Sequence, residues 1–304
     1  MREALIAYSR GECDTPMPMH LEIPSAGQEA YATAEAHMKS SYRRGGRYFA
    51  LKMASTFPGN RARGLATGNG MMLLSSAETG EPEVLLADAG HLTDVRTAAV
   101  AAMAARELGR TDAAIGILGT GIQARLQAQM HAEVLDLKQV WIWGRNPARV
   151  EECRRDLAGL LPGVAIGVAD SPRSLARETK LIVTATASRQ PLLAAGDLWP
   201  GTHVSAVGSD SPGKQELDPQ ILRDAALLLV DSERQCEKLG ELQHAPDQWE
   251  RAVELGAFCE AGDAAARRHW DRTGVTVCDF TGLGVEDLYI AEYVYHEYCC
   301  QGAN

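Results

Sequence analysis

The chain has 304 residues, of which 40 are acidic and 30 are lysine or arginine, so its formal net charge is −10. Hydrophobic residues make up 45% and charged residues 23%, a globular composition that excludes a wholly disordered chain. The acidic balance argues against broad binding to nucleic acid or to an anionic membrane.

Segments that would direct the chain to a membrane or to secretion are not visible in the sequence. No apolar run approaches the ~18 residues of a membrane span, and the N-terminal residues lack the apolar stretch of a secretory signal. The seven cysteines contain no C-x-x-C pair, which favours reduced thiols. We therefore expect a cytoplasmic protein that does not bind membranes.

The first hundred residues predict a small α+β domain. Short apolar runs at 48–53, 71–74 and 84–87 indicate strands of a meander, and 93–108 is an alanine-rich predicted helix. We place this domain over residues 1–109, with a boundary near Gly109. The last predicted helix, in the segment 286–304, is expected to return to it.

From residue 113 onward the pattern becomes regular. Short apolar runs alternate with helical or turn segments, which is typical of βαβ units and a parallel sheet covered on both faces. Right-handed crossovers make this a doubly wound, Rossmann-type domain, which we place over residues 110–285. The strands are predicted at 113–118, 140–143, 164–168, 181–184, 204–207 and 227–230, and helices at 123–135 and from Asn146-Pro147 to about 161.

A glycine-rich turn joins the first of these strands to its helix. Residues Gly119, Thr120, Gly121, Ile122, Gln123 and Ala124 read G-x-G-x-x-A. In this pattern the first glycine allows a tight turn, the second lets the backbone approach a pyrophosphate, and the alanine permits close helix–strand packing. The alternative is a strand–helix turn that binds nothing, but the flanking elements favour a dinucleotide site. Thr184 and Thr186 are further candidate cofactor contacts.

The end of the second strand indicates which dinucleotide is bound. An acidic residue there would bind the ribose 2′-hydroxyl of NAD. This chain instead has Arg145 and Asn146, with Arg149 one turn later, which suits the 2′-phosphate of NADP. We therefore predict NADPH, with NADH as the alternative; Arg145 could also stack on adenine or face solvent.

Three charged residues stand among apolar or small neighbours. They are Lys52, Arg96 and Asp210, and a charge inside a core is costly unless it is paired. The alternatives are that Lys52 lies on the solvent face of a strand, Arg96 on a helix surface, and Asp210 in a cap or turn. Asp210 also follows a predicted parallel strand, where ligands of α/β sheets bind. The histidines show no ligand spacing, so no metal site is expected.

Four segments resemble the ornithine cyclodeaminase/μ-crystallin family. They are residues 93–99, 119–124, 209–218 and 279–287, in the family's order within a resemblance that covers about 45–290. The resemblance implies a homodimer, with catalysis between the dimerisation domain and the Rossmann domain. It also implies that Lys52 and Arg96 hold a substrate carboxylate and that Asp210 faces the substrate nitrogen. His20 lies near the place where family members often have an arginine.

The resemblance leaves several activities open. They are reduction of a cyclic ketimine, cyclodeamination of ornithine or lysine with catalytic NAD, a μ-crystallin-like NADPH-dependent binding role, and a role in ectoine utilisation. Arg145 in place of an acid favours net reduction, because a redox-neutral enzyme gains nothing from NADP. Residues 57–60, 68–74 and 238–244 resemble the branch of this family that holds pyrroline-2-carboxylate reductases and ectoine-utilisation proteins. This resemblance implies a reductase that converts Δ1-pyrroline-2-carboxylate, or its piperideine homologue, to L-proline or the homologous product, with a role in proline metabolism.

Overall fold

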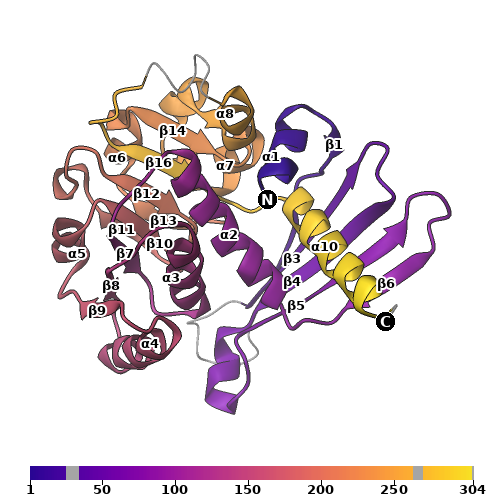
Figure 1. The fold of residues 1–304 in the computed structure, drawn as a ribbon, viewed down its shortest axis with the longest axis horizontal. Coiled ribbons are helices and arrows are strands. Elements are labelled where there is room, and N and C mark those ends of the chain that lie inside the picture. The colour runs from indigo at the N-terminus through magenta and orange to yellow at the C-terminus, as the bar shows by residue number, and fades with distance from the viewer. Residues whose placement is uncertain (25–33, 263–269, 303–304) are drawn as a thin grey trace. The chain divides into compact units, whose positions relative to one another are not determined.

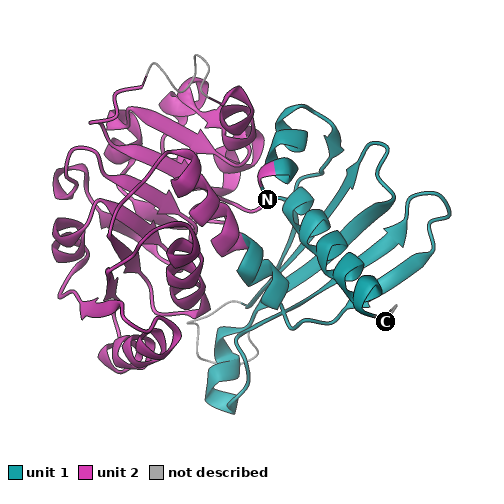
Figure 2. Ribbon diagram, viewed as in Figure 1, with its two compact units in different colours: residues 1, 3–96, 283–304 teal, residues 2, 97–282 magenta. Residues whose placement is uncertain are grey.

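The computed structural model describes residues 1–24, 34–262 and 270–302, and the chain forms two compact units (Figures 1 and 2). Unit 1 contains residues 1, 3–96 and 283–304, and unit 2 contains residues 2 and 97–282. The boundary between them falls inside helix α2 (His91–Glu107), whereas the sequence had placed it after this helix, near Gly109. The chain enters unit 1 again at Leu283, one residue before helix α10 (Gly284–Gly302) begins.

Unit 1 is built on a six-stranded sheet in the order β1-β3-β4-β5-β6, with β2 paired to β3, and all of its pairings are antiparallel. The strands predicted at 48–53, 71–74 and 84–87 correspond to β4, β5 and β6. The first three strands carried no apolar run. In β3 the reason is visible, because Glu35, His37 and Lys39 occupy alternate positions of the strand. The elements of unit 1 are α1 (Arg2–Ser9), β1 (Cys13–Asp14), β2 (Met19–Ile23), β3 (Ala34–Arg43), β4 (Tyr48–Thr56), a 3-10 turn (Pro58–Arg63), β5 (Gly68–Ser76) and β6 (Pro82–Leu86).

Helix α10 lies along one face of this sheet (Figure 1). Its Leu288 and Ala291, three residues apart on one helix face, pack in a buried cluster with Ala50 of β4 and Leu74 of β5. The helix begins very close to the backbone of β3, since a Cβ added to Gly284 would lie 2.4 Å from the carbonyl oxygen of Ser40. Glycine is therefore required where α10 begins.

Unit 2 contains an eight-stranded sheet whose pairings are all parallel, which confirms the predicted doubly wound fold. The strand order is β15-β14-β16-β12-β10-β7-β8-β9, so the winding reverses between β7 and β10. Ligands of open α/β sheets bind at this switch point, outside the carboxyl ends of the strands. The strands are β7 (Ala114–Leu118), β8 (Gln139–Trp143), β9 (Ala165–Val168), β10 (Leu181–Thr184), β12 (His203–Ala206), β14 (Leu227–Val230), β15 (Val253–Glu254) and β16 (Thr276–Asp279).

Helices and a second small sheet complete unit 2. Strands β11 (Arg189–Leu193) and β13 (Gln215–Leu217) pair in parallel, and a cluster of buried side chains from the large sheet and its helices forms the core. Of the helices in unit 2 that follow α2, the sequence predicted only α3 and α4. The helices are α3 (Ile122–Val134), α4 (Pro147–Leu160), α5 (Pro172–Glu178), α6 (Pro219–Asp224), α7 (Glu233–Leu239) and α8 (Leu255–Ala261), with 3-10 turns at Ala195–Asp197, Glu241–His244 and Pro246–Arg251. Within the described ranges, no helix combines the length and apolar character needed to span a membrane.

Candidate functional site

The glycine-rich turn lies between β7 and α3, at the switch point of the parallel sheet. Gly119 has φ +134°, and a Cβ there would lie 2.5 Å from the carbonyl oxygen of Ala185, just after β10. A Cβ on Gly121 would meet no heavy atom within 4 Å, so this part of the backbone faces open space. Ala124 is fully buried beneath the turn. The arrangement therefore fits a dinucleotide, because a pyrophosphate needs close approach to the backbone at a helix N-terminus.

Arg125, which the sequence reasoning missed, holds the backbone of this turn. Its Nη1 donates to the carbonyl oxygens of Thr120 and Gly121, each at 3.0 Å, and its Nη2 pairs with Asp156 at 2.6 Å. Ile122, which follows Gly121 in the chain, is 52% exposed. The turn thus combines fixed peptide groups with an exposed apolar side chain, and both could contact a bound cofactor.

The end of β8 carries the residues proposed to select the cofactor. Asn146 is the N-cap of α4, and its Oδ1 accepts hydrogen bonds from the backbone N–H groups of Ala148 and Arg149 at 3.0 and 3.3 Å. Its side chain therefore has a structural role in the helix. Arg145 is exposed, and no carboxylate in the described part of the chain forms an ion pair with it. Its guanidinium could therefore meet an anionic ligand without first breaking an ion pair.

A buried glutamate joins the loops that follow β10 and β12. The backbone N–H and the hydroxyl of Thr186 donate to Oε1 of Glu216 at 2.7 and 2.6 Å, and the N–H of Gly208 donates to Oε2 at 3.0 Å. Burial raises the pKa of Glu216 to about 7. The donors of Thr186 therefore point toward Glu216, while Thr184, the last residue of β10, is fully buried. Sequence reasoning gave Glu216 no role.

Asp210 follows β12, at the carboxyl end of a parallel strand, as the sequence predicted. Its Oδ1 accepts from Lys214 Nζ at 2.7 Å and from Ser211 Oγ at 3.1 Å, and 43% of its side chain is exposed. The next helix in the chain, α6, begins only at Pro219, and its N-cap is Asp218. Asp210 is thus not an N-cap residue. Its partner Lys214 lies four residues later in the same loop and was not singled out by the sequence pattern.

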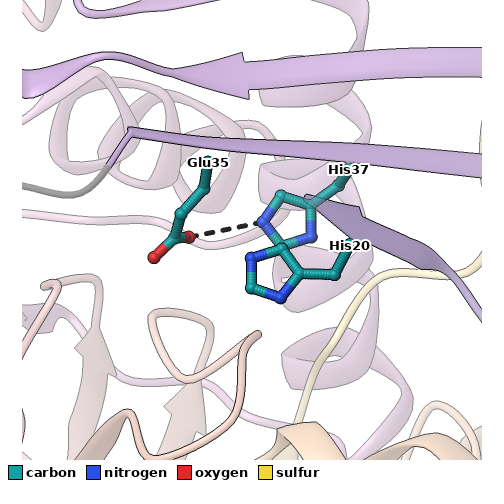
Figure 3. A group of neighbouring side chains, drawn as sticks. All are labelled: His20, Glu35 and His37. Carbon is teal, nitrogen blue, oxygen red and sulfur yellow. Dashed lines mark hydrogen bonds and ion pairs between the residues drawn. The ribbon is translucent and has the colours of Figure 1, made fainter. Parts of the chain in front are cut away.

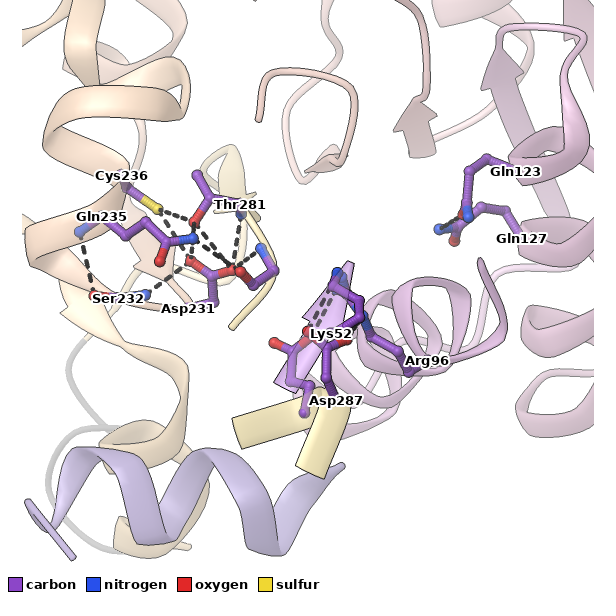
Figure 4. Close-up of polar contacts among 12 residues, drawn as sticks. Lys52, Arg96, Gln123, Gln127, Asp231, Ser232, Gln235, Cys236, Thr281 and Asp287 are labelled. Carbon is purple, nitrogen blue, oxygen red and sulfur yellow. Dashed lines mark hydrogen bonds and ion pairs between the residues drawn. The ribbon is translucent and has the colours of Figure 1, made fainter. Parts of the chain in front are cut away.

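Lys52 and Arg96 come together in unit 1 at the first turn of α10 (Figure 4). Lys52 Nζ lies 3.2 Å from Asp287 Oδ2, and Arg96 Nε lies 3.0 Å from Asp287 Oδ1. Nη1 of Arg96 also contacts Oε2 of Glu286 at 2.8 Å. Both cations are 4% exposed, so the interpretations that placed Lys52 on a solvent face and Arg96 on a helix surface are wrong. The sequence did not identify Glu286 or Asp287 as their partners.

Burial controls the protonation of this ion-pair cluster. Loss of water lowers the pKa of Lys52 to about 7; Asp287 opposes this shift, while nearby Lys39 and Arg96 add to it. Burial alone would raise the pKa of Asp287, but Lys52, Arg96 and Lys39 hold it below its usual value. The cluster therefore keeps a carboxylate ionised beside a lysine that can gain or lose a proton near neutral pH.

A second network fixes the segment that leads from β16 to α10 (Figure 4). Asp231 Oδ2 accepts from the N–H groups of Thr281 and Gly282 at 2.8 and 2.6 Å, and Gln235 Nε2 donates to the carbonyl oxygen of Gly282 at 2.8 Å. Gly282 has φ +73°, a conformation that glycine adopts without strain. Thr281 and Gly282 belong to the segment 279–287, one of the four that carry the family resemblance. These contacts show that both residues hold the backbone of this segment in place.

His20 lies on β2, directly opposite His37 of β3. The two rings stack with centroids 4.5 Å apart and planes 12° from parallel (Figure 3). Strand alternation and register place both histidines on the sheet face that also carries Lys39 and Lys52. The structure thus groups Lys52 with Arg96, and places His20 on the same face beside a histidine that the sequence had not indicated.

Comparison with known proteins gives a consistent result. The model of the ornithine cyclodeaminase/mu-crystallin family matches residues 2–301. An uncharacterized cyclodeaminase of Sinorhizobium fredii is 38% identical, over 91% of this chain and 82% of that protein. A Δ1-pyrroline-2-carboxylate reductase of Bacillus cereus is 30% identical, over 93% of this chain and 86% of that protein.

Solved structures share the fold over almost the whole chain. The Δ1-pyrroline-2-carboxylate reductase of Thermococcus litoralis, in complex with NADH and L-proline, has a TM-score of 0.87 at 24% identity and covers 99% of this chain and 92% of its own. An archaeal alanine dehydrogenase dimer with bound NAD has a TM-score of 0.85 at 27% identity, and the match covers 99% of this chain and 90% of the dehydrogenase chain.

The pKa of Lys52 predicts a pH-dependent stability. Below about pH 7 Lys52 is protonated in the folded and unfolded chain, so the full cost of its buried charge is present. Between about pH 7 and its ordinary value of 10.5, the folded chain releases this proton and the unfolded chain keeps it, so the free energy of unfolding rises. In Lys52→Met this contribution is lost, and denaturant unfolding at several pH values measures the difference between the two proteins.

The matched control is Lys138→Met, which removes an exposed lysine paired with Asp136. Its curve should run parallel to that of the unmodified protein from pH 7 to 10. Parallel curves for Lys52→Met as well would show that Lys52 does not titrate in this range.

Proposed function

The chain belongs to the ornithine cyclodeaminase/mu-crystallin family, and on this premise we propose that it is an NADPH-dependent reductase of cyclic ketimine carboxylates. The proposed substrate is Δ1-pyrroline-2-carboxylate, which yields L-proline, with the piperideine homologue as a second substrate. The observation that carries the proposal is the burial of Lys52 and Arg96 in one cluster. Two cations held out of water suit a small carboxylate, and the Bacillus cereus relative is named for this reaction.

Lys52 and Arg96 would bind the substrate carboxylate. A guanidinium offers five N–H donors in a fixed plane and an ammonium offers three. Glu286 and Asp287 engage Nε and Nη1 of Arg96, which holds the plane of the guanidinium in one orientation. A carboxylate bound there would be fixed by charge-assisted hydrogen bonds, and most of the rate gain would come from this positioning.

Asp210 would face the ring nitrogen of the substrate. A carboxylate beside an iminium keeps it protonated and therefore electrophilic at C2. Lys214 Nζ lies 2.7 Å from Asp210 Oδ1 and holds this carboxylate in place. A bound nicotinamide would supply the hydride, and the open backbone at Gly121 would hold its pyrophosphate.

Arg145 supports NADPH as the reductant. It is exposed near the place where an acid would bind the ribose hydroxyls of NAD. A guanidinium can bind the additional 2′-phosphate of NADP through two parallel hydrogen bonds. Arg149, one turn into α4, would add a second cation, whereas Asn146 serves as the helix cap.

Two copies of the chain would associate through the sheet of unit 1. The face of this sheet opposite α10 exposes apolar side chains of β2, β4, β5 and β6, which we call the open face. Apolar patches of this kind mark interfaces in proteins, and the alanine dehydrogenase neighbour is a dimer. The open face consists of Met19, Leu21, Ile23, Leu51, Met53, Met71 and Leu85, which are 36–61% exposed.

A cyclodeaminase is the second candidate, because the Sinorhizobium fredii relative is named as one. The two activities differ in whether the reductant is consumed. The reductase oxidises NADPH only when the cyclic imine is supplied. The cyclodeaminase releases ammonia from ornithine with catalytic NAD. A protein that binds NADPH tightly and turns over neither compound would support the binding role instead.

The first prediction from the proposed function concerns Asp210. In an NADPH-oxidation assay with the pyrroline and piperideine carboxylates, Asp210→Asn should lower kcat/KM about 10²- to 10⁴-fold, because the iminium loses its ionised partner. Asp136→Asn, in an exposed Asp–Lys pair, serves as the control and should retain full activity. Full activity of Asp210→Asn would remove this residue from the mechanism, and failure of the unmodified protein with both rings would reject the reductase.

The second prediction concerns cofactor choice. Arg145→Asp should lower kcat/KM for NADPH about 10- to 100-fold, the loss expected when a charge-assisted hydrogen bond of about 1.5–3 kcal/mol is removed. The value for NADH should rise, since the new carboxylate can bind the ribose hydroxyls. Steady-state kinetics with both cofactors measure the ratio. An unchanged ratio would refute selection by Arg145.

The third prediction concerns the open face. Leu51→Glu should convert the dimer to a monomer, because it places a charge at the centre of a buried apolar interface. Sedimentation velocity measures the change in mass. The control is Leu65→Glu, since Leu65 is 59% exposed and lies outside the sheet. A dimer that persists in Leu51→Glu, or a monomeric unmodified protein, would contradict the assignment.

A further inference from the structure

Three potential metal ligands meet on the sheet of unit 1 (Figure 3). His20 and His37 are direct partners in the pairing of β2 with β3, and Glu35 lies two residues before His37, on the same face of β3. One ligand atom from each residue lies within 4.8 Å of the other two. We call this group the His–Glu–His cluster. The sequence gave no sign of it, because His20 lies far from Glu35 and His37 in the chain and only strand register brings the three residues together.

The hydrogen bonds within the cluster leave one nitrogen unsatisfied. His37 Nε2 lies 3.4 Å from Glu35 Oε2, a long contact. His20 Nε2 is buried from water and has no hydrogen-bond partner among the described residues. A buried polar atom without a partner is costly. Beside a second imidazole and a carboxylate there is therefore a ligand-type nitrogen whose required interaction none of the described residues supplies.

This donor set matches one class of cation. Two imidazoles and one carboxylate are the protein ligands of zinc sites that keep a fourth position open. Ligand atoms about 2.0–2.2 Å from such an ion lie within roughly 4 Å of one another, so the observed spread needs only a small contraction. Stacked parallel rings cannot both direct their nitrogen lone pairs at one ion, so one ring must turn. Because both histidines are only partly buried, a side-chain rotation suffices.

We propose that His20, Glu35 and His37 bind one divalent transition-metal ion of the zinc class, with a fourth position open to water or an anion. The cluster lies on the same sheet face as Lys39 and Lys52. The open position of the metal would accept a carboxylate oxygen of the proposed cyclic imine substrate. The metal would thereby supply a positive charge near the place where family members often have an arginine. This second role rests on the proposed function, whereas metal binding does not.

A second pair of potential ligands needs a control. Cys300 Sγ lies 3.8 Å from His296 Nδ1 on the exposed surface of α10, and a thiolate with an imidazole can also bind cobalt or zinc. The two locations differ in spectrum, because only the α10 pair would give a sulfur-to-cobalt charge-transfer band. A substitution also separates the two locations, because His296→Gln removes a ligand of the α10 pair and leaves the His–Glu–His cluster unchanged.

The test is a titration of chelator-treated protein with Co²⁺, followed by Zn²⁺ competition. The expected result is one ion per chain with a visible d–d band and no charge-transfer band. Affinity should fall at least about 10-fold in His37→Gln and in Glu35→Gln, and His296→Gln should leave it unchanged. Circular dichroism of the metal-free variants checks that each remains folded.

Two results would overturn the metal site. One is Co²⁺ binding that is unchanged in His37→Gln; the other is binding that is lost in His296→Gln. Adding L-proline to the cobalt protein tests the second role, because entry of a carboxylate at the open position shifts the d–d band, and an unchanged band excludes it. The NADPH-oxidation assay tests the proposed function independently of metal binding. A protein that binds Co²⁺ as expected but reduces neither imine would retain the metal site while the proposed function fails.

Discussion

The fold of unit 1 depends on the burial of two cations against the first turn of α10. Asp287 contacts both Lys52 and Arg96, and Glu286 adds a second contact to Arg96. Removing one partner of a buried ion pair costs about 3–5 kcal/mol, because the remaining charge has neither water nor a counter-ion. The acidic residues also stand at a helix N-terminus, where the helix dipole favours negative charge.

The same helix neutralises these charges and completes the hydrophobic core. Leu288, the residue after Asp287, and Ala291, one turn after Asp287, pack with Ala50 and Leu74 of the sheet. The charges therefore fix the register of α10 on the sheet, while the apolar contacts supply the larger buried area. The residues proposed to bind substrate are held by contacts that also maintain the fold, which is a form of preorganisation.

Unit 2 uses buried carboxylates to hold its functional loops. Glu216 accepts hydrogen bonds from the loops after β10 and β12, and its own backbone N–H donates to Glu241 at 2.7 Å. Asp279 accepts from the N–H of Leu242 at 2.9 Å, and burial raises its pKa to about 7. These loops are irregular, so side chains supply the hydrogen bonds that a sheet would otherwise provide. The loop that carries Asp210 is fixed in this way.

The sequence predicted what depends on local patterns and missed what depends on distant partners. Strands β10 and β14 were predicted to the residue, since each is a short buried apolar run. Strand β3 was missed because titratable residues line one of its faces. Lys52 and Arg96 stood out as charges among apolar neighbours, but Arg96 and Asp287 are 191 residues apart. No local pattern can reveal such a pairing, nor the strand register that sets His20 opposite His37.

The discontinuity of unit 1 has a consequence for synthesis on the ribosome. Lys52 and Arg96 are made before the 186 residues of 97–282, whereas their counter-charges on α10 follow unit 2. At about 5–20 residues per second, the earlier segment waits on the order of 10–40 s for its partner helix. During this interval its two cations stay hydrated and its sheet lacks the covering helix. Unit 2, which is almost continuous in the chain, can fold first, so a nascent chain that stops before residue 284 leaves unit 1 unable to close its core.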